Sequence, residues 1–232
     1  MRRKHKIMQY VILTRSLREN TRLAKILKEN GIESISCPQI TLKEQDIDLS
    51  KLTYSNIIIT SKFAAEIVAQ KLSSPVKAYV VGEESALILS TNPAITVKKV
   101  YSKVSELEQG LRDKLARDDF TYLSGNYVTK ELPCQRLIIY NTTYTNYISH
   151  EAIKLIKAGK IKAVLIYSKR TAISFKETII CNNLTSYMVN IQLITLSKQI
   201  GLEFVDLGCK ILYCNKPREV EMINLLKNAV YG

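Results

Sequence analysis

The chain has 232 residues, of which 46% are hydrophobic and 24% charged; this composition is typical of a folded globular protein and excludes a largely disordered chain. Five scattered cysteines form no Cys-x-x-Cys pair, which argues against a disulfide framework or a zinc site and favours reduced thiols in the cytoplasm. The formal net charge of +13 suits a polyanionic partner, but the basic residues are spread along the chain apart from residues 2–6, so compositional drift is preferred over nucleic-acid binding.

The apolar segment at residues 7–13 follows this basic start and resembles a signal peptide only superficially. It is short, Gln9 interrupts it, and no small-residue cleavage site follows. We therefore expect a buried strand there. No other stretch approaches the length needed to span a membrane.

Further along the chain, short apolar segments alternate with amphipathic ones, which is typical of β-α-β units on a parallel sheet. The predicted strands cover residues 10–13, 57–59, 79–81, 121–123, 137–140, 163–166, 193–196 and 211–213. Apolar side chains at helical spacing predict helices between most of them. Capping boxes, Ser16 with Glu19 and Ser105 with Glu108, are expected to begin two of the helices.

Two parts of the chain read as copies of one α/β unit. Residues 57–65 can be laid over residues 165–172, since both read strand, serine, lysine, two residues and alanine. The strand before Thr14 resembles the strand before Gly125, yet it comes first in one unit and last in the other. This inverted order predicts two similar, doubly wound parallel-sheet α/β domains, with one inserted into a discontinuous outer domain.

The boundaries follow from the same order of elements. The expected outer domain comprises residues 1–37 and 144–232, and the inner domain comprises residues 42–136. Residues 38–41 and 137–143 would form two linker strands between them, since Pro38 and β-branched residues suit extended chain.

Small polar residues and glycines stand at the carboxyl ends of the predicted strands, where parallel sheets bind ligands through helix amino termini. These candidates are Thr14, Ser61, Gly82, Ser85, Gly125, Asn126, Ser168 and Ser197. Helix capping alone explains Ser16, Ser61 and Ser105. Two facing domains with such donor-rich edges would nevertheless suit a large ligand carrying several carboxylates in a cleft.

Several common catalytic motifs are absent from the sequence. There is no dinucleotide-binding glycine motif, phosphate-binding loop, nucleophile elbow or zinc-protease motif. The two histidines, His5 and His150, lie in a tail and in the first turn of a helix. Tyrosine, serine, lysine and backbone amides must therefore do the chemistry, and neither a metal nor an organic cofactor is expected.

The ordered set of motifs resembles the uroporphyrinogen-III synthase family over nearly the whole chain. The matching segments are Leu13-Thr14-Arg15, Ile59-Thr60-Ser61, Val80 to Ala86, Leu123 to Asn126, Ile139 to Thr142 and Lys216-Pro217. The chain departs from the family pattern at Ser16, Ser85 and Ser124, where the family usually has proline, threonine and arginine. The helix expected between Asn126 and Leu137 is also short.

The resemblance implies two flavodoxin-like domains with the active site in the cleft between them. It implies a cytoplasmic enzyme that closes hydroxymethylbilane, a linear tetrapyrrole with eight carboxylates, with loss of water and inversion of the terminal ring through a spiro intermediate. Tyr140 matches the family's characteristic tyrosine and is the candidate to hydrogen-bond the leaving hydroxyl, with Tyr144 as the alternative. The eight edge residues named above become candidate carboxylate binders, and a transient contact with the preceding pathway enzyme is expected.

Two other functions stay open at this point. One is a non-catalytic, two-lobed binding module for a small polyanion, against which Tyr140 favours the enzyme. The other is a nucleic-acid-binding protein, suggested by charge alone, which would need its basic residues on one continuous face.

Overall fold

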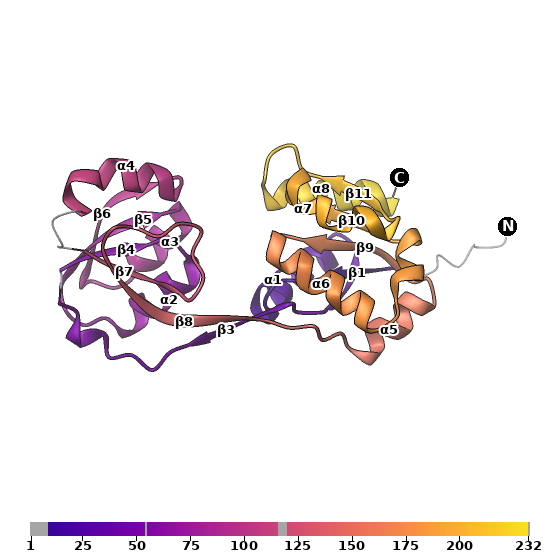
Figure 1. Ribbon diagram of the computed structural model, residues 1–232, viewed down its shortest axis with the longest axis horizontal. Helices are drawn as coiled ribbons and strands as arrows, with labels where there is room; N and C mark the ends of the chain where they lie inside the picture. Colours follow the sequence, from indigo (N-terminus) through magenta and orange to yellow (C-terminus); the bar gives the residue numbers. More distant parts are fainter. Residues whose placement is uncertain (1–8, 54, 116–119, 232) are drawn as a thin grey trace. The chain divides into compact units, whose positions relative to one another are not determined.

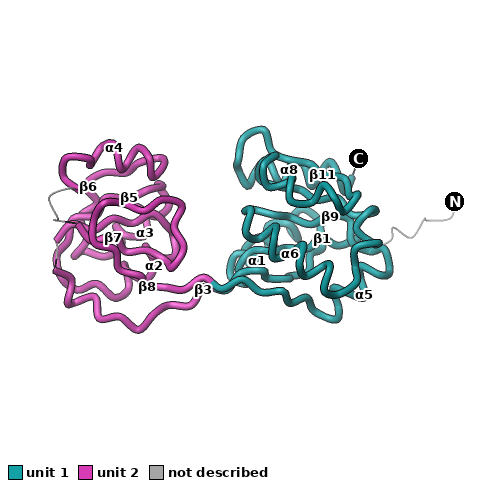
Figure 2. Tube along the Cα trace, in the orientation of Figure 1, with its two compact units in different colours: residues 1–41, 143–232 teal, residues 42–142 magenta. Residues whose placement is uncertain are grey.

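The computed structural model describes residues 9–53, 55–115 and 120–231, which form two compact units (Figure 2). The outer unit contains the described residues up to Thr41 and from Thr143 onward, and the inner unit runs from Leu42 to Thr142. The basic run at residues 2–6 and His5 lie outside the described residues. Both units are α/β with largely parallel sheets, so the predicted fold class is confirmed.

The outer unit is built on a five-stranded parallel sheet in the order β11-β10-β9-β1-β2 (Figure 1). Its strands are β1 (Tyr10–Leu13), β2 (Glu33–Ser36), β9 (Ile161–Ile166), β10 (Gln192–Thr195) and β11 (Lys210–Tyr213). The helices on one face are α1 (Leu17–Glu29) and α8 (Glu219–Tyr231). The other face carries α5 (His150–Lys157), α6 (Lys169–Cys181), α7 (Lys198–Gly201) and the 3₁₀ segments η2 (Thr185–Asn190) and η3 (Leu202–Leu207).

Helices on both faces explain why the central strands of this sheet are continuously apolar. In β1, Val11 and Leu13 pack into the core beneath α1 and α8, whereas Ile12 packs into the core beneath α5 and α6. All three side chains are fully buried. A strand covered on both sides cannot alternate polar and apolar residues, so it reads as one hydrophobic run.

The inner unit repeats this arrangement on a six-stranded sheet in the order β3-β8-β7-β4-β5-β6. Its strands are β3 (Ile40–Glu44), β4 (Asn56–Ile59), β5 (Val76–Val81), β6 (Ile95–Tyr101), β7 (Phe120–Gly125) and β8 (Gln135–Tyr144). The core on one face includes residues of α2 (Lys62–Lys71) and α3 (Glu83–Leu89), and the other face is covered by α4 (Val104–Leu115). The short 3₁₀ segment η1 (Leu49–Lys51) follows β3.

The two strands that pass between the units run in opposite directions. The Gln45 N–H donates to the Ile139 carbonyl over 2.9 Å, and the Thr145 N–H donates to the Gln39 carbonyl over 3.1 Å. Residue numbers therefore rise on β3 as they fall on β8, which is antiparallel pairing. Strand β8 also pairs in parallel with β7, so Tyr140 belongs to the inner unit's sheet.

Both predicted capping boxes are wrong in detail. The Ser16 side chain makes no capping hydrogen bond, and Glu19 instead pairs with Arg15 and Arg22. Helix α4 begins at Val104, ahead of the expected serine cap, because Glu106 reaches back to the Ser102 N–H and hydroxyl. In both cases a glutamate takes part in other contacts: Glu19 pairs with arginines, and Glu106 rather than Glu108 accepts from the residue before the helix. The capping-box spacing considers only the serine and the residue three positions later.

Other elements differ from the expectation as well. No helix forms between Asn126 and Leu137, since residues 126–134 run in loop conformation to β8. The sequence did not predict β2, a polar strand at the sheet edge, or β6, whose alternation is interrupted at Lys98 and Lys99.

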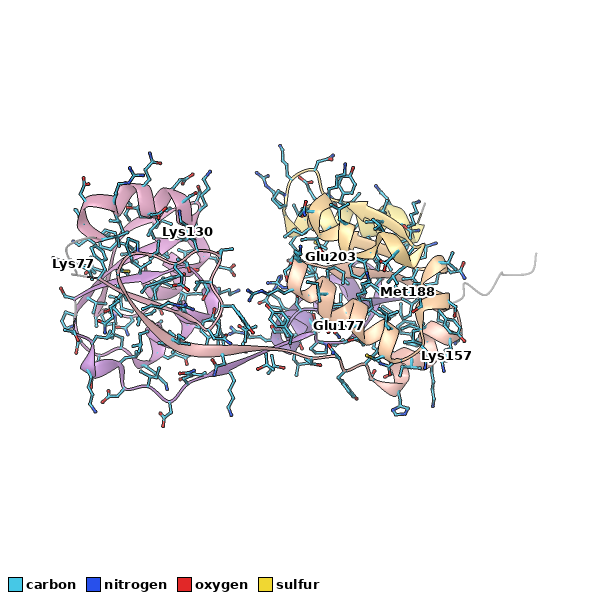
Figure 3. The ribbon with its side chains drawn as sticks, viewed as in Figure 1. Lys77, Lys130, Lys157, Glu177, Met188 and Glu203 are labelled. Carbon is cyan, nitrogen blue, oxygen red and sulfur yellow. The ribbon has the colours of Figure 1, made fainter. Side chains whose placement is uncertain are left out.

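Charged side chains project from both units. Lys77 and Lys130 of the inner unit and Lys157 of the outer unit are exposed, whereas Met188 is fully buried (Figure 3). In the described part of the chain, none of the helices combines the length and apolar character needed to cross a bilayer.

Candidate functional site

Each sheet presents a carboxyl edge, where its parallel strands end and the following helices begin. Such edges bind ligands in open α/β folds because the first backbone N–H groups of the helices point outward. All eight candidate binding residues stand at strand ends or in the helical turns that follow them, three in the outer unit and five in the inner unit.

At the outer edge, Thr14 and Ser168 are occupied by structural bonds. Thr14 is fully buried, and its hydroxyl donates to the Leu165 carbonyl over 2.7 Å. Ser168 caps α6 by accepting from the Thr171 N–H over 3.1 Å. The Thr14 side chain thus holds β1 to β9, and a ligand at this edge would meet backbone N–H groups first.

Ser197 lies in a different setting, at the mouth of a pocket of about 620 Å³. It precedes α7 without making a side-chain capping bond. The Thr195 hydroxyl donates to the Ser197 carbonyl over 2.9 Å and so fixes the turn. The pocket is lined by Ser197, Lys198, Gln199, Leu202, Tyr213, Cys214 and Asn215. The lining includes an exposed lysine beside a helix start, a combination whose charge and dipole favour anions over cations.

A cluster of charged residues occupies the same edge beside β1 and β9. Arg15 contacts Glu219 at 3.3 Å, and its guanidinium lies 4.8 Å from the centre of the Tyr167 ring. Arg22 contacts Glu219 at 2.6 Å. Burial raises the pKa of Tyr167, whose hydroxyl is enclosed without a hydrogen-bond partner among the described residues. Sequence reasoning used Arg15 only as part of a motif and did not anticipate this cluster, because Glu219 is distant in sequence.

At the inner edge, Tyr140 and Ser61 come together. The Tyr140 hydroxyl donates to the Ser61 Oγ over 3.1 Å, and the same oxygen accepts from the Ala64 N–H as the cap of α2. The Tyr140 ring meets the Phe63 ring edge-on, with centroids 5.0 Å apart. Only 7% of Tyr140 is exposed, so its ring is part of the core and its hydroxyl end is fixed. Tyr144 is half-buried farther along β8.

Gly125 and Asn126 support this arrangement. A Cβ atom on Gly125 would lie 2.5 Å from two Tyr140 ring carbons, so only glycine leaves room for the ring. The Asn126 side chain is paired with the backbone of Thr142, accepting from its N–H over 2.7 Å and donating to its carbonyl over 3.3 Å. The Asn126 side chain therefore joins the end of β7 to β8.

Gly82 and Ser85 lie at the start of α3. Gly82 has a φ of +92°, a conformation that favours glycine, and it precedes the helix without a side chain to cap it. Ser85 is only 5% exposed. A ligand at this segment would therefore meet backbone N–H groups before side chains.

Two further residues at the inner edge escaped the sequence analysis. Arg136 donates to the Ser124 hydroxyl over 2.9 Å and to the Gly125 carbonyl over 2.6 Å. The Tyr122 hydroxyl lies 2.7 Å from the Thr60 hydroxyl, and burial raises the pKa of Tyr122. Both depend on neighbouring strands, and no local spacing would have revealed them.

The described residues contain no group of three or more histidine, cysteine or acidic side chains able to hold a metal ion. His150 is exposed at the start of α5. The side chains described at the two edges supply hydroxyls, phenols, amides, cations and, at the outer edge, the Glu219 carboxylate.

Comparison with known proteins agrees with these features. The family model described as uroporphyrinogen-III synthase HemD matches residues 21–224, which is most of the chain. The chain belongs to the uroporphyrinogen-III synthase family. The expected resemblance is confirmed, and the match favours the synthase over a non-catalytic binding module or a nucleic-acid-binding protein.

Individual relatives are distant in sequence. The chain is 27% identical to an uncharacterized protein of Rickettsia prowazekii, with 94% of this chain and 98% of the relative covered. The uroporphyrinogen-III synthetase of Helicobacter pylori is 13% identical, covers 95% of this chain and 99% of its own, and superposes with a TM-score of 0.62. A mutant uroporphyrinogen-III synthase of Thermus thermophilus is 11% identical, with 96% and 98% covered and a TM-score of 0.57. At these identities the two structures support the fold.

Proposed function

We propose that the protein is a cytoplasmic hydro-lyase that cyclises hydroxymethylbilane to uroporphyrinogen III, with loss of water and inversion of the terminal ring. The family match over residues 21–224 carries this proposal. The chemistry needs a flexible polyanion to be held in one folded conformation, which is chiefly a matter of positioning. No cofactor is required in this scheme.

In this proposal, backbone N–H groups at the carboxyl edges bind the substrate's carboxylates. The supporting features are the helix starts at Gly82 and Ser197, because neither has a side-chain cap that would occupy its first N–H groups. Ser61, Ser168 and the buried Thr14 would contribute mainly by holding these edges in shape. Ser85, Gly125 and Asn126 are assigned to the same binding surface of the inner unit.

Tyr140 is the proposed donor to the leaving hydroxyl. The Tyr140 hydroxyl donates its one proton to the Ser61 Oγ, so donation to the leaving hydroxyl requires this O–H to turn from Ser61 to the substrate. The Ser61 Oγ would then still accept from the Ala64 N–H. Assistance by one positioned acid typically contributes ~10²–10⁴ in rate.

The proposed partners are the anionic substrate and, transiently, the enzyme that makes it. A net charge of +13 favours encounter with an octacarboxylate through the field of the whole protein. All five cysteines are free, as suits a reducing compartment.

The test is to supply hydroxymethylbilane to the purified full-length chain and to separate the product isomers. We expect the type III isomer, without added metal and in the presence of a chelator. Formation of only the type I isomer, which arises spontaneously, would overturn the proposal.

A further inference from the structure

A β-bulge in the edge strand β6 brings Lys99 and Tyr101 to a pocket that they share with residues of α4. The register with β5 shifts after Ala78, which pairs with Val97, so that Tyr79 pairs with Lys99 and Lys98 is the extra residue. Ile95, Val97 and Val100 consequently pack with the core that includes α2 and α3 residues, whereas Tyr101 packs with the core beneath α4. Bulges commonly re-aim side chains in this way next to functional sites.

Helix α4 has room for Tyr101 because of an interior glycine. A Cβ atom on Gly110 would lie 2.9 Å from the Tyr101 Cε1 and 3.1 Å from its hydroxyl oxygen. Glycine inside a helix is unfavourable, so the helix gives up stability at the place where the phenol lies. Tyr101 is 7% exposed, and its hydroxyl has no hydrogen-bond partner among the described residues.

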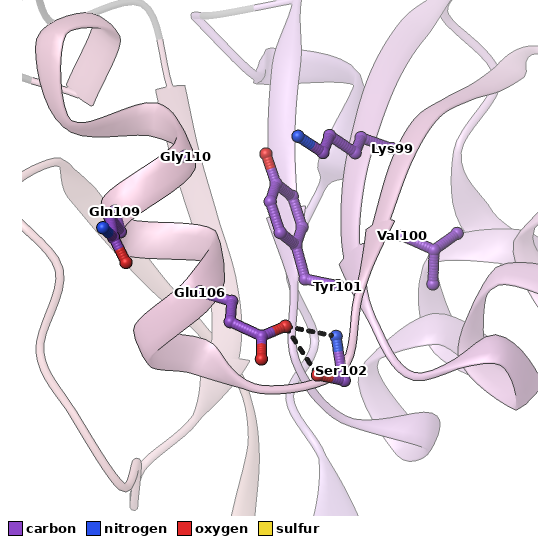
Figure 4. A pocket seen from close by; sticks show the side chains of 7 residues that line it. All are labelled: Lys99, Val100, Tyr101, Ser102, Glu106, Gln109 and Gly110. Carbon is purple, nitrogen blue, oxygen red and sulfur yellow. Dashed lines mark hydrogen bonds between the residues drawn. The ribbon is translucent and has the colours of Figure 1, made fainter.

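These residues line a pocket of about 370 Å³ (Figure 4). The pocket is formed by Lys99, Val100, Tyr101, Ser102, Glu106, Gln109 and Gly110. Figure 4 shows the Tyr101 hydroxyl and the Lys99 ammonium at the same end of the pocket, and the ammonium lies 4.9 Å from the centre of the Tyr101 ring.

The charges of the pocket favour an anion. Glu106 is engaged by the Ser102 N–H and hydroxyl and lies 3.7 Å from the Lys103 ammonium. Among the residues that the structure describes, the Lys99 ammonium forms no ion pair and lies over the Tyr101 ring. Burial, with a smaller contribution from Tyr79, raises the pKa of Tyr101, so its hydroxyl remains a donor at neutral pH. The Lys99 ammonium, which has no ion-pair partner in the described part of the chain, and the Tyr101 hydroxyl, which has no acceptor there, therefore lie in the same pocket.

We propose that this pocket binds a carboxylate group, with the Lys99 ammonium and the Tyr101 hydroxyl as its two donors. Where the carboxylate is a side chain of the tetrapyrrole, this inference rests on the proposed function; a free small carboxylate has the same chemistry. Movement of the flexible Lys99 side chain off the ring opens the hydroxyl to the ligand.

The experiment measures dissociation constants of the full-length chain for two probes, uroporphyrin, which carries eight carboxylates, and citrate. The variants are Lys99→Met and Tyr101→Phe. Lys77→Met is the matched control, since it removes the same charge from an exposed lysine near the amino end of β5. We expect the dissociation constant for uroporphyrin to rise about five- to tenfold in Lys99→Met and about threefold in Tyr101→Phe, with Lys77→Met within twofold of wild type. Tyr101→Phe removes only an unpartnered hydroxyl, so its melting temperature should equal or exceed that of wild type.

The two probes separate the sources of the carboxylate. Loss of uroporphyrin binding alone assigns the pocket to the tetrapyrrole, whereas a parallel loss of citrate binding assigns it to carboxylates in general. If the wild type makes no type III isomer but citrate binding still depends on Lys99 and Tyr101, the proposed function fails and the pocket stands. If both variants bind both probes as the control does, or the wild type binds neither, the pocket proposal is overturned.

Discussion

Substituting Gly125 by alanine tests whether the inner edge is built around Tyr140. The added Cβ would lie 2.5 Å from the Cε2 and Cζ atoms of the ring, whereas ordinary contacts are about 3.5–4.0 Å. The ring must move by about 1 Å to restore that separation. Phe63 stands against one side of the ring and Ser61 holds the hydroxyl, so this displacement disturbs both contacts.

The expected loss of stability follows from these contacts. Overpacking a well-packed core costs about 1–3 kcal/mol, and the lost hydroxyl bond adds about 1 kcal/mol. A change of 1 kcal/mol shifts the melting temperature of a domain of about 100 residues by roughly 4–8 °C. We therefore expect the melting temperature of the inner unit to fall by about 8–30 °C. Turnover should fall as well if Tyr140 has its proposed role.

The assay is a double-mutant cycle with Tyr140→Leu, followed by thermal and denaturant unfolding. Leucine removes the ring atoms that clash, so the two changes should couple by about 1 kcal/mol or more. Gly208→Ala is the control. Its backbone has a φ of +65° with open space around the added Cβ, so alanine there is strained without a clash. The loss of unfolding free energy in Gly208→Ala should be the same whether or not Tyr140→Leu is present.

Two results would refute this reasoning. One is a melting temperature for Gly125→Ala within about 2 °C of wild type, far below the shift worked out above. The other is simple additivity of the Gly125 and Tyr140 changes within about 0.5 kcal/mol, which would mean that the ring moves away freely.

Three further predictions follow from the contacts above. Tyr140→Phe should lower turnover clearly while lowering the melting temperature by only about 4–8 °C through loss of the hydroxyl bond, and Ser61→Ala and Ser197→Ala should lower turnover less because their backbone N–H groups survive; a dead serine variant beside a fully active Tyr140→Phe in steady-state assays would reverse these roles. Gln39→Leu should lower the free energy of unfolding by about 1–3 kcal/mol in urea titrations, because leucine removes the amide that donates to the Cys37 and Tyr147 carbonyls and accepts from the Ser174 and Thr178 hydroxyls; an unchanged urea midpoint would contradict this. Burial raises the pKa of Cys37 from 9.0 to about 12, so its contribution to stability is complete below pH 9 and is lost as the pH rises toward 12; Cys37→Val should remove that part of the pH dependence, and identical curves for the two proteins would count against it.

Local features of the sequence determined much of the fold. The apolar runs of the central strands follow from burial on both faces, as in Val11, Ile12 and Leu13. The serine cap of α2 forms as the sequence predicts, because the Ser61 hydroxyl needs only the N–H three residues ahead. Ser168, at the corresponding position of the other unit, caps α6 in the same way. A contact between residues close together in the chain can be predicted from their spacing in the sequence.

The tertiary structure decided the rest. Tyr140 meets Ser61 only because β8 lies beside β7 and β7 beside β4, and the space for its ring comes from Gly125 on the intervening strand. The bulge in β6 depends on its register with β5, and it changes the face to which Tyr101 belongs. A one-residue shift in strand register reverses the face of every side chain that follows, and that register is set by packing between segments distant in the sequence, which no local pattern records.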